Sequence, residues 1–137
     1  MTTTPQMKNQ ASQGVSYLLF VVLVFETREG EQIFAEKVTA DCWKTPKMLS
    51  SKQVSGKVYF TDQRIAFFAS GLIETKSASW EINMADIAQV KPCMISMFFP
   101  FGIMIILKNN DKYKLSIMKR NKYIDWILQH ISESYSG

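Results

Sequence analysis

Residues 56–68, Gly-Lys-Val-Tyr-Phe-Thr-Asp-Gln-Arg-Ile-Ala-Phe-Phe, restrict the fold of this chain more than any other stretch. Two runs rich in β-branched and aromatic residues flank the polar corner Thr61-Asp62-Gln63. Val, Ile, Tyr and Phe suit a pleated, half-buried surface, whereas Asp at a corner accepts hydrogen bonds from turn amides. The pattern therefore predicts a β-hairpin. Arg64 follows the corner, and its guanidinium is expected to stabilise the turn through Asp62 or loop carbonyls.

Further segments with β-strand composition follow at short intervals. The predicted strands cover residues 32–42, 58–60, 64–69, 78–82, 87–90, 102–108 and 113–118. A polar loop is expected at 43–55, Pro92 is expected to end the fifth strand, and 109–111 favour a turn. Seven short strands at this spacing indicate a small antiparallel barrel or sandwich.

The hairpin also resembles a signature of the GRAM and bacterial PH-like domains. That family's motif reads Gly-x-Leu-Tyr-Leu-Thr-(Asn/Asp)-x-Arg-Leu-x-Phe, and Val58 and Phe60 stand where it usually has Leu. Further landmarks follow in the family's order at residues 82–90, 105–115 and 123–131. The resemblance covers roughly residues 29–132. It implies a PH-like fold, a seven-stranded antiparallel barrel or sandwich capped by one C-terminal helix.

A C-terminal helix also has local support in the sequence. Apolar residues recur at helical spacing at Ile124, Ile127, Leu128 and Ile131. Asn121 can cap the first turn through its side-chain oxygen, and Trp126 is expected in the core. A helix with one apolar face has to bury that face, and the resemblance implies that it covers the open end of the barrel.

The N-terminal residues depart from the family pattern. Residues 1–14 predict a flexible tail and 15–28 an extra apolar element, which leaves 29–133 for the PH-like domain. The apolar run 15–25 is roughly half of the ~20 residues that a membrane-spanning helix needs. An element packed on the domain, strand or helix, is the favoured interpretation. A signal peptide, a membrane contact or a self-association contact are the alternatives.

Length and composition fit a single domain. A chain of 137 residues with 47% hydrophobic residues can bury a core without disulfides. The net charge of +4 is uneven, because acids outnumber bases in residues 1–36 and lysines cluster in 37–57 and 108–122. Such a surface attracts lipid headgroups, nucleic acid or an acidic protein, or serves only as a solvated face. Nucleic acid is the weaker choice, because the aromatics alternate with aliphatic residues and not with lysines.

The sequence contains no catalytic or metal-binding pattern. Cys42 and Cys93 lie far apart without a neighbouring histidine, and His130 is the single histidine. No metal and no cofactor are therefore expected, and the protein is predicted to be non-enzymatic. The thiols favour the reducing cytosol, with peripheral attachment at the inner membrane surface as an alternative.

Two features define the candidate site. The apolar contact loop, with Met97, Phe98, Phe99 and Phe101, falls between predicted strands, and an exposed apolar patch of this kind marks a lipid or protein contact. The alternative is that this stretch belongs to the core. The resemblance implies an anionic-lipid site on the lysines after the first strand, here Lys44, Lys47 and Lys52, helped by Lys57.

These features favour a peripheral adaptor that binds anionic membrane lipid. The alternative is a protein-interaction or homo-oligomerisation module without lipid binding, in which residues 15–25 and 94–101 would support a homodimer.

Overall fold

The computed structural model describes residues 25–48, 53–70, 78–97 and 99–136. In these residues it contains seven strands, a 3-10 turn and a C-terminal helix. They are β1 (Ile33–Lys44), β2 (Val54–Thr61), β3 (Arg64–Ala69), β4 (Trp80–Asn83), η2 (Met84–Asp86), β5 (Ile87–Cys93), β6 (Gly102–Leu107), β7 (Lys112–Ile117) and α4 (Arg120–Ser136). The predicted fold class, mainly β with one C-terminal helix, is confirmed.

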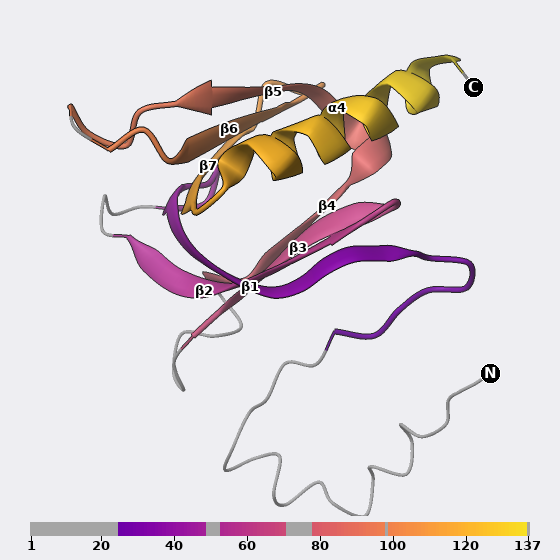
Figure 1. Ribbon diagram of the computed structural model, residues 1–137, viewed down its shortest axis with the longest axis horizontal. Coiled ribbons are helices and arrows are strands. Elements are labelled where there is room, and N and C mark those ends of the chain that lie inside the picture. Colours follow the sequence, from indigo (N-terminus) through magenta and orange to yellow (C-terminus); the bar gives the residue numbers. More distant parts are fainter. Residues whose placement is uncertain (1–24, 49–52, 71–77, 98, 137) are drawn as a thin grey trace, which may run out of the picture.

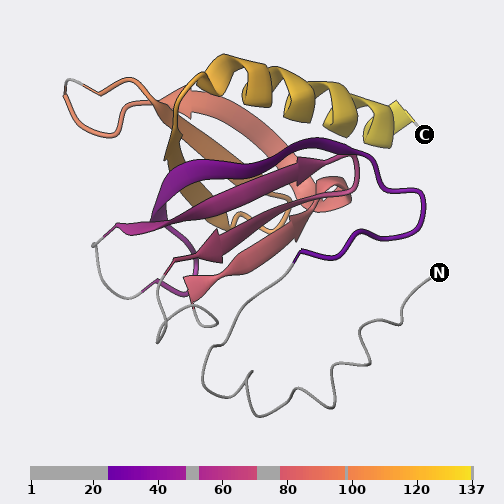
Figure 2. The same ribbon diagram turned by 60° about the horizontal axis from the view of Figure 1, so that its bottom comes forward.

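Strand β1 connects the two halves of one antiparallel sheet, whose order is β4-β3-β2-β1-β7-β6-β5. Ala40 pairs with Gly56 of β2 on one side and with Ile117 of β7 on the other. A register shift in β1 coincides with Lys37, whose φ is 54°, and such a bulge bends a strand. The sheet therefore folds over into two layers, β1–β4 and β5–β7, with α4 along the open side (Figures 1 and 2).

The core lies between the layers and under α4. Val58 and Phe60 of β2 are buried there, together with Ile65 and Phe67 of β3, because alternate residues of a strand face the same side. The helix contributes Tyr123, Ile124, Ile127 and Ile131. The prediction for Leu128 is wrong: it is 44% exposed, because the buried stripe is centred on Ile127 and Leu128 lies on its flank.

Three predicted boundaries are wrong. β5 continues through Pro92, which pairs with Ile103, because β5 is an edge strand and its partnerless side needs no amide donor. The loop predicted at 43–55 is shorter, since β1 reaches Lys44 and β2 begins at Val54. Asn121 lies inside α4 instead of capping it, since the helix begins at Arg120.

Arg64 does stabilise the hairpin corner, but not through Asp62. Its Nε and Nη2 donate to both carboxylate oxygens of Glu31 at 2.8 and 3.0 Å, and its Nη1 donates to Glu81 at 3.1 Å. It also donates to the carbonyl oxygen of Glu26, as expected for a loop carbonyl. Asp62 instead accepts from the backbone N–H of Gln32 at 2.9 Å. The segment before β1 is thereby bound to the sheet.

Of the N-terminal apolar element predicted at 15–28, only residues 25–28 lie in the described part of the chain. The ring of Phe25 stacks on Tyr59 with 4.4 Å between centroids, and Arg64 Cζ lies 4.3 Å from the Phe25 ring. The predicted tail at 1–14 and residues 15–24 lie outside the described part. Among the described residues, no helix is long and apolar enough to cross a membrane.

Candidate functional site

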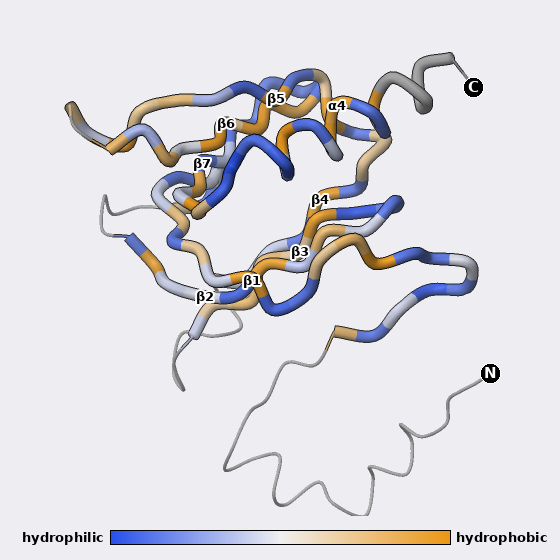
Figure 3. Tube along the Cα trace, viewed as in Figure 1, coloured by the Kyte–Doolittle hydropathy of each residue, from blue (hydrophilic) through white to orange (hydrophobic). Residues whose placement is uncertain are grey.

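The connection between β5 and β6 is a projecting apolar turn. The Ile95 N–H donates to the Phe99 carbonyl at 3.0 Å, and the Phe99 N–H donates to the Ser96 carbonyl at 3.3 Å, which closes a tight turn. Met97 is 78% exposed and Phe99 55% exposed, while Met94 and Phe101 are exposed to a lesser degree. Apolar residues occupy much of this turn, which extends beyond the body of the domain (Figures 1 and 3). Phe98 lies outside the described residues.

We call residues 94–101 the β5–β6 turn. The base of this turn is hydrogen-bonded to the start of α4 and to the end of β7. Arg120 Nη1 donates to the carbonyl oxygens of Cys93 and Gly102 at 2.9 and 3.1 Å. The Ile117 N–H donates to the Phe101 carbonyl at 3.0 Å. A side chain at Gly102 would bring a Cβ within 2.7 Å of the Cys93 carbonyl oxygen, so only glycine fits this close approach. The turn is therefore held in a defined position.

A row of lysines crosses the outer face of the second layer. Lys91 of β5 pairs with Met104 of β6, Met104 with Lys114 of β7, and Lys114 with Lys44 of β1. Directly paired residues share a face, and like charges placed opposite each other destabilise a sheet. Lys44 and Lys114 are thus directly opposite each other, while Met104 separates Lys114 from Lys91 on the same face.

A second basic group lies at the link from β7 to α4. Met118 is 67% exposed, and Lys119 and Lys122 are exposed beside it. Lys119 adopts a φ of 57°, which directs the chain into the helix, and Lys122 Nζ lies 5.2 Å from the Tyr123 ring centroid. Because Ile117 and Arg120 bond to the β5–β6 turn, this link lies directly beside it.

The pKa of the Cys93 thiol, at the base of the turn, is affected by nearby positive charges. Burial raises the pKa of its thiol, and the positive charges of Lys114, Arg120 and Lys91 partly oppose that rise. These cations come from β5, β7 and α4. The base of the apolar turn is thus surrounded by positive charge from three elements.

The structure separates the lysines predicted from the sequence. Lys44 ends β1 and Lys47 lies in the following loop, both exposed, while Lys52 is outside the described residues. Lys57 lies within β2, and its Nζ donates to Thr39 Oγ1 at 2.8 Å. Thr39, its partner on β1, is five residues before Lys44, so at about 3.4 Å per residue the two lysines lie roughly 17 Å apart along the sheet. Lys57 is not brought together with Lys44.

Sequence reasoning missed Lys91, Met118 and the structural role of Arg120. The alternation Lys112-Tyr113-Lys114 does place both lysines on one face of a predicted strand. Which residues of other strands lie next to these lysines, however, depends on strand register, and register cannot be read from a local sequence pattern.

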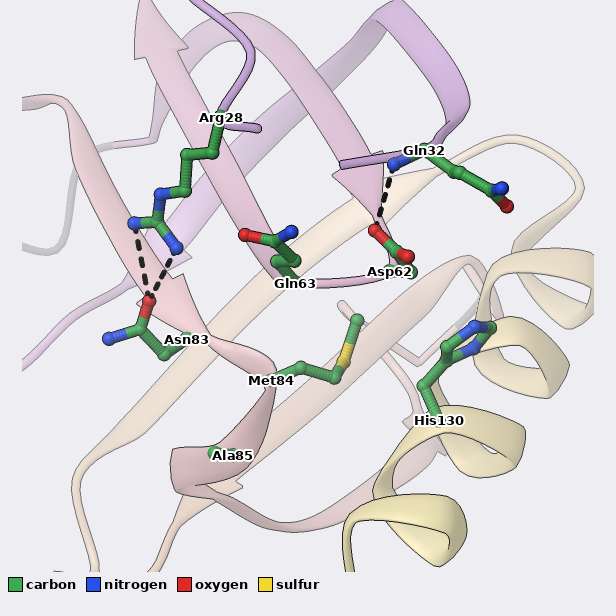
Figure 4. Close-up of a pocket in the computed structure, with 8 residues that line it drawn as sticks. All are labelled: Arg28, Gln32, Asp62, Gln63, Asn83, Met84, Ala85 and His130. Atoms are coloured by element: carbon green, nitrogen blue, oxygen red, sulfur yellow. Dashed lines mark hydrogen bonds between the residues drawn. The ribbon is translucent and has the colours of Figure 1, made fainter. Parts of the chain in front are cut away.

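A shallow pocket of about 680 Å³ lies where the β2–β3 corner, η2 and α4 meet (Figure 4). It is lined by Arg28, Gln32, Asp62, Gln63, Asn83, Met84, Ala85 and His130. Several of its polar groups are already paired: Arg28 donates to Asn83 Oδ1 at 3.4 Å, and His130 Nδ1 lies 2.8 Å from the Trp126 carbonyl oxygen. Across the described part of the chain, no group of three His, Cys, Asp or Glu side chains could hold a metal ion.

Comparison with solved structures supports the PH-like fold. The chain is similar to the Vps36 N-terminal PH domain, with a TM-score of 0.61 and 16% identity, covering 82% of this chain and 87% of that one. It is also similar to the C-terminal domain of an unknown protein from Leishmania infantum, with a TM-score of 0.58, 16% identity and coverage of 88% and 97%.

A third similar structure is human RhoA in complex with a DH/PH fragment of PDZRHOGEF, with a TM-score of 0.56 and 8% identity. That match covers 96% of this chain and 34% of the other. No protein-family model and no curated protein matches the sequence. At these identities the similarity defines the class of fold, PH-like, and nothing narrower.

Proposed function

We propose that this chain is a non-enzymatic PH-like binding module, of the GRAM type that its hairpin resembles, which docks on anionic membrane surfaces. The observation that carries the proposal is the β5–β6 turn, where Met97 and Phe99 are 78% and 55% exposed on a turn fixed at its base. Burying one such side chain is worth about 1.5–3 kcal/mol. An apolar tip held in place avoids the entropy cost of ordering a flexible loop on binding.

Basic side chains around the tip supply the second contribution. A lysine near an anionic leaflet contributes ~1 kcal/mol, so a few lysines alone give only modest affinity. Lys44, Lys47 and Lys52 are the candidates from the sequence, and Lys44 belongs to the row with Lys114 and Lys91. Charge and apolar insertion are expected to act together.

The proposed location is the cytoplasmic face of a membrane. Cys42 and Cys93 are both free thiols, which suits a reducing compartment.

The test is co-sedimentation of the full chain with vesicles of phosphatidylcholine alone and of phosphatidylcholine mixed with phosphatidylserine, at low and high salt. Wild type is expected to bind the anionic vesicles, and Met97→Ser combined with Phe99→Ser should remove the binding that survives high salt. Leu128→Ser is the matched control, because Leu128 is an exposed apolar residue on α4. Wild type that ignores anionic vesicles at low salt would exclude the lipid function.

A protein partner, including a second copy of this chain, is the second candidate. The same exposed apolar turn supports it, and one similar structure is a DH/PH fragment in complex with RhoA. Analytical ultracentrifugation distinguishes the homodimer: a wild-type dimer that Phe99→Ser converts to a monomer, with no vesicle binding, would favour this candidate.

A further inference from the structure

We propose that the membrane-facing surface consists of two adjacent turns, the β5–β6 turn and the β7–α4 turn (residues 118–122), and that Lys91, Lys119 and Lys122 are its cations. The partner is a bilayer that contains anionic phospholipid. This inference rests on the proposed function and specifies which surface performs it.

Backbone and side-chain hydrogen bonds join the two turns into one surface. The Ile117 N–H donates to the Phe101 carbonyl, and Arg120 donates to the carbonyls of Cys93 and Gly102 on both sides of the β5–β6 turn. The β5–β6 turn and the first turn of α4 lie at the same end of the molecule in both ribbon views (Figures 1 and 2). The two turns are therefore held next to each other.

The apolar side chains of the two turns form the contact. Met97, Met118 and Phe99 are 78%, 67% and 55% exposed, the highest values among the large hydrophobic residues of the described part. Their location on two joined turns concentrates this exposed apolar surface at one end of the domain. Such an arrangement is typical of a site that enters a lipid interface.

The charges on the two turns are all positive. Residues 94–101 and 118–122 contain Lys119, Arg120 and Lys122 but no Asp or Glu. Arg120 is occupied by the two carbonyls at the base, which leaves the exposed Lys119 and Lys122 for headgroups. Lys91 is exposed two residues before Cys93, on the strand that leads into the β5–β6 turn.

The lysines after β1 are less well placed. Lys44 and Lys91 belong to one row but are separated by three strand spacings, about 14 Å at ~4.8 Å each. That separation exceeds the screening length of about 8 Å at physiological ionic strength. Lys44 therefore adds little to the potential at Lys91 and at the start of the turn into which β5 leads.

The experiment compares two charge-matched double variants of the full chain on phosphatidylcholine–phosphatidylserine vesicles. Lys119→Gln with Lys122→Gln is expected to lower the vesicle partition coefficient by roughly tenfold to thirtyfold, because two headgroup-facing lysines are removed. Lys44→Gln with Lys47→Gln removes the same charge and should change it by less than about twofold. Met118→Ser should weaken binding at high salt as Met97→Ser does.

The outcomes separate the two proposals. If the Lys44 and Lys47 variant loses as much binding as the Lys119 and Lys122 variant, the inference is wrong while the proposed function stands. Wild type that binds no vesicle overturns both. Hydrogen exchange of wild type gives an independent measurement: vesicles should protect the amides of residues 94–101 and 118–122 and leave 45–48 unchanged, and the reverse pattern contradicts the inference.

Discussion

At the scale of single residues, Arg64 and Glu31 form a buried ion pair with two hydrogen bonds between them. The Glu31 side chain is fully buried and that of Arg64 nearly so. Burial by itself raises the pKa of Glu31, but hydrogen bonds from Arg64 and Thr61 outweigh burial and lower the pKa from 4.5 to about 2. Both groups are therefore charged, and removing Arg64 leaves the Glu31 carboxylate buried without its cationic partner.

Arg64→Ala is expected to lower the free energy of unfolding by about 3–5 kcal/mol, because the Glu31 carboxylate loses its bidentate partner. Arg28→Ala is the control: its ion pair with Glu81 has both side chains about 40% exposed, so the cost should stay below about 1 kcal/mol. Urea denaturation measures both. Normal stability of Arg64→Ala with lost partner binding would show instead that Arg64 is a ligand-binding residue.

The Glu31 pair also predicts a pH dependence. Because the pKa of Glu31 is lower in the folded than in the unfolded protein, its stabilisation is complete above the unfolded value of 4.5 and is lost as pH falls toward about 2. Glu31→Gln should therefore be less stable at neutral pH and lose less stability over that acid range. Thermal melts at successive pH values test this, and parallel curves for the two proteins would contradict it.

At the scale of elements, α4 closes the sandwich through a narrow stripe. Ile127 is fully buried, whereas Trp126 is half-buried, stacks on Phe34 at 4.4 Å and donates from Nε1 to the Thr61 carbonyl at 3.1 Å. Trp126 thus joins the helix to β1 and to the end of β2. The helix depends on aliphatic burial at Ile127 and on a polar and aromatic contact at Trp126.

Truncation of this stripe is expected to be costly. Ile127→Ala should lower the free energy of unfolding by about 2–5 kcal/mol through lost burial and a residual cavity. Leu128→Ala, one residue further and 44% exposed, should change it by less than about 1 kcal/mol. Urea midpoints of the two variants give the comparison, and an unaltered midpoint for Ile127→Ala would mean that α4 is not docked as described.

At the scale of the whole molecule, the three most exposed large apolar side chains of the described residues, Met97, Met118 and Phe99, lie on the β5–β6 turn and on the adjacent β7–α4 turn. The buried Arg64–Glu31 ion pair and the shallow pocket instead lie at the β2–β3 corner. This arrangement supports docking through the end with the β5–β6 turn, while the end with the β2–β3 corner contributes to stability. Vesicle binding should accordingly have a salt-sensitive part from lysines and a salt-resistant part from Met97 and Phe99.

The fold was predictable because its signals are local. The β-rich composition of residues 58–68 and the helical spacing of apolar residues at 124–131 depend on residues close in sequence, and both elements are confirmed. The same logic failed at Pro92 and Asn121. Whether proline interrupts a strand depends on its place in the sheet, and a helix start depends on the preceding backbone, here Lys119 with a φ of 57°.

By itself, therefore, the amino-acid sequence determined the strands, the final helix and the PH-like fold class. Only the tertiary structure decided which side chains meet, because pairings such as Ala40 with Ile117 join residues far apart in the chain. Three such long-range contacts matter here. Arg64 pairs with Glu31, and the lysine row crosses four strands. Met118 lies beside the β5–β6 turn. The alternation of side chains along a strand decides which residues share a face of that strand. The pairing register between distant strands decides which residues of the neighbouring strands lie beside them.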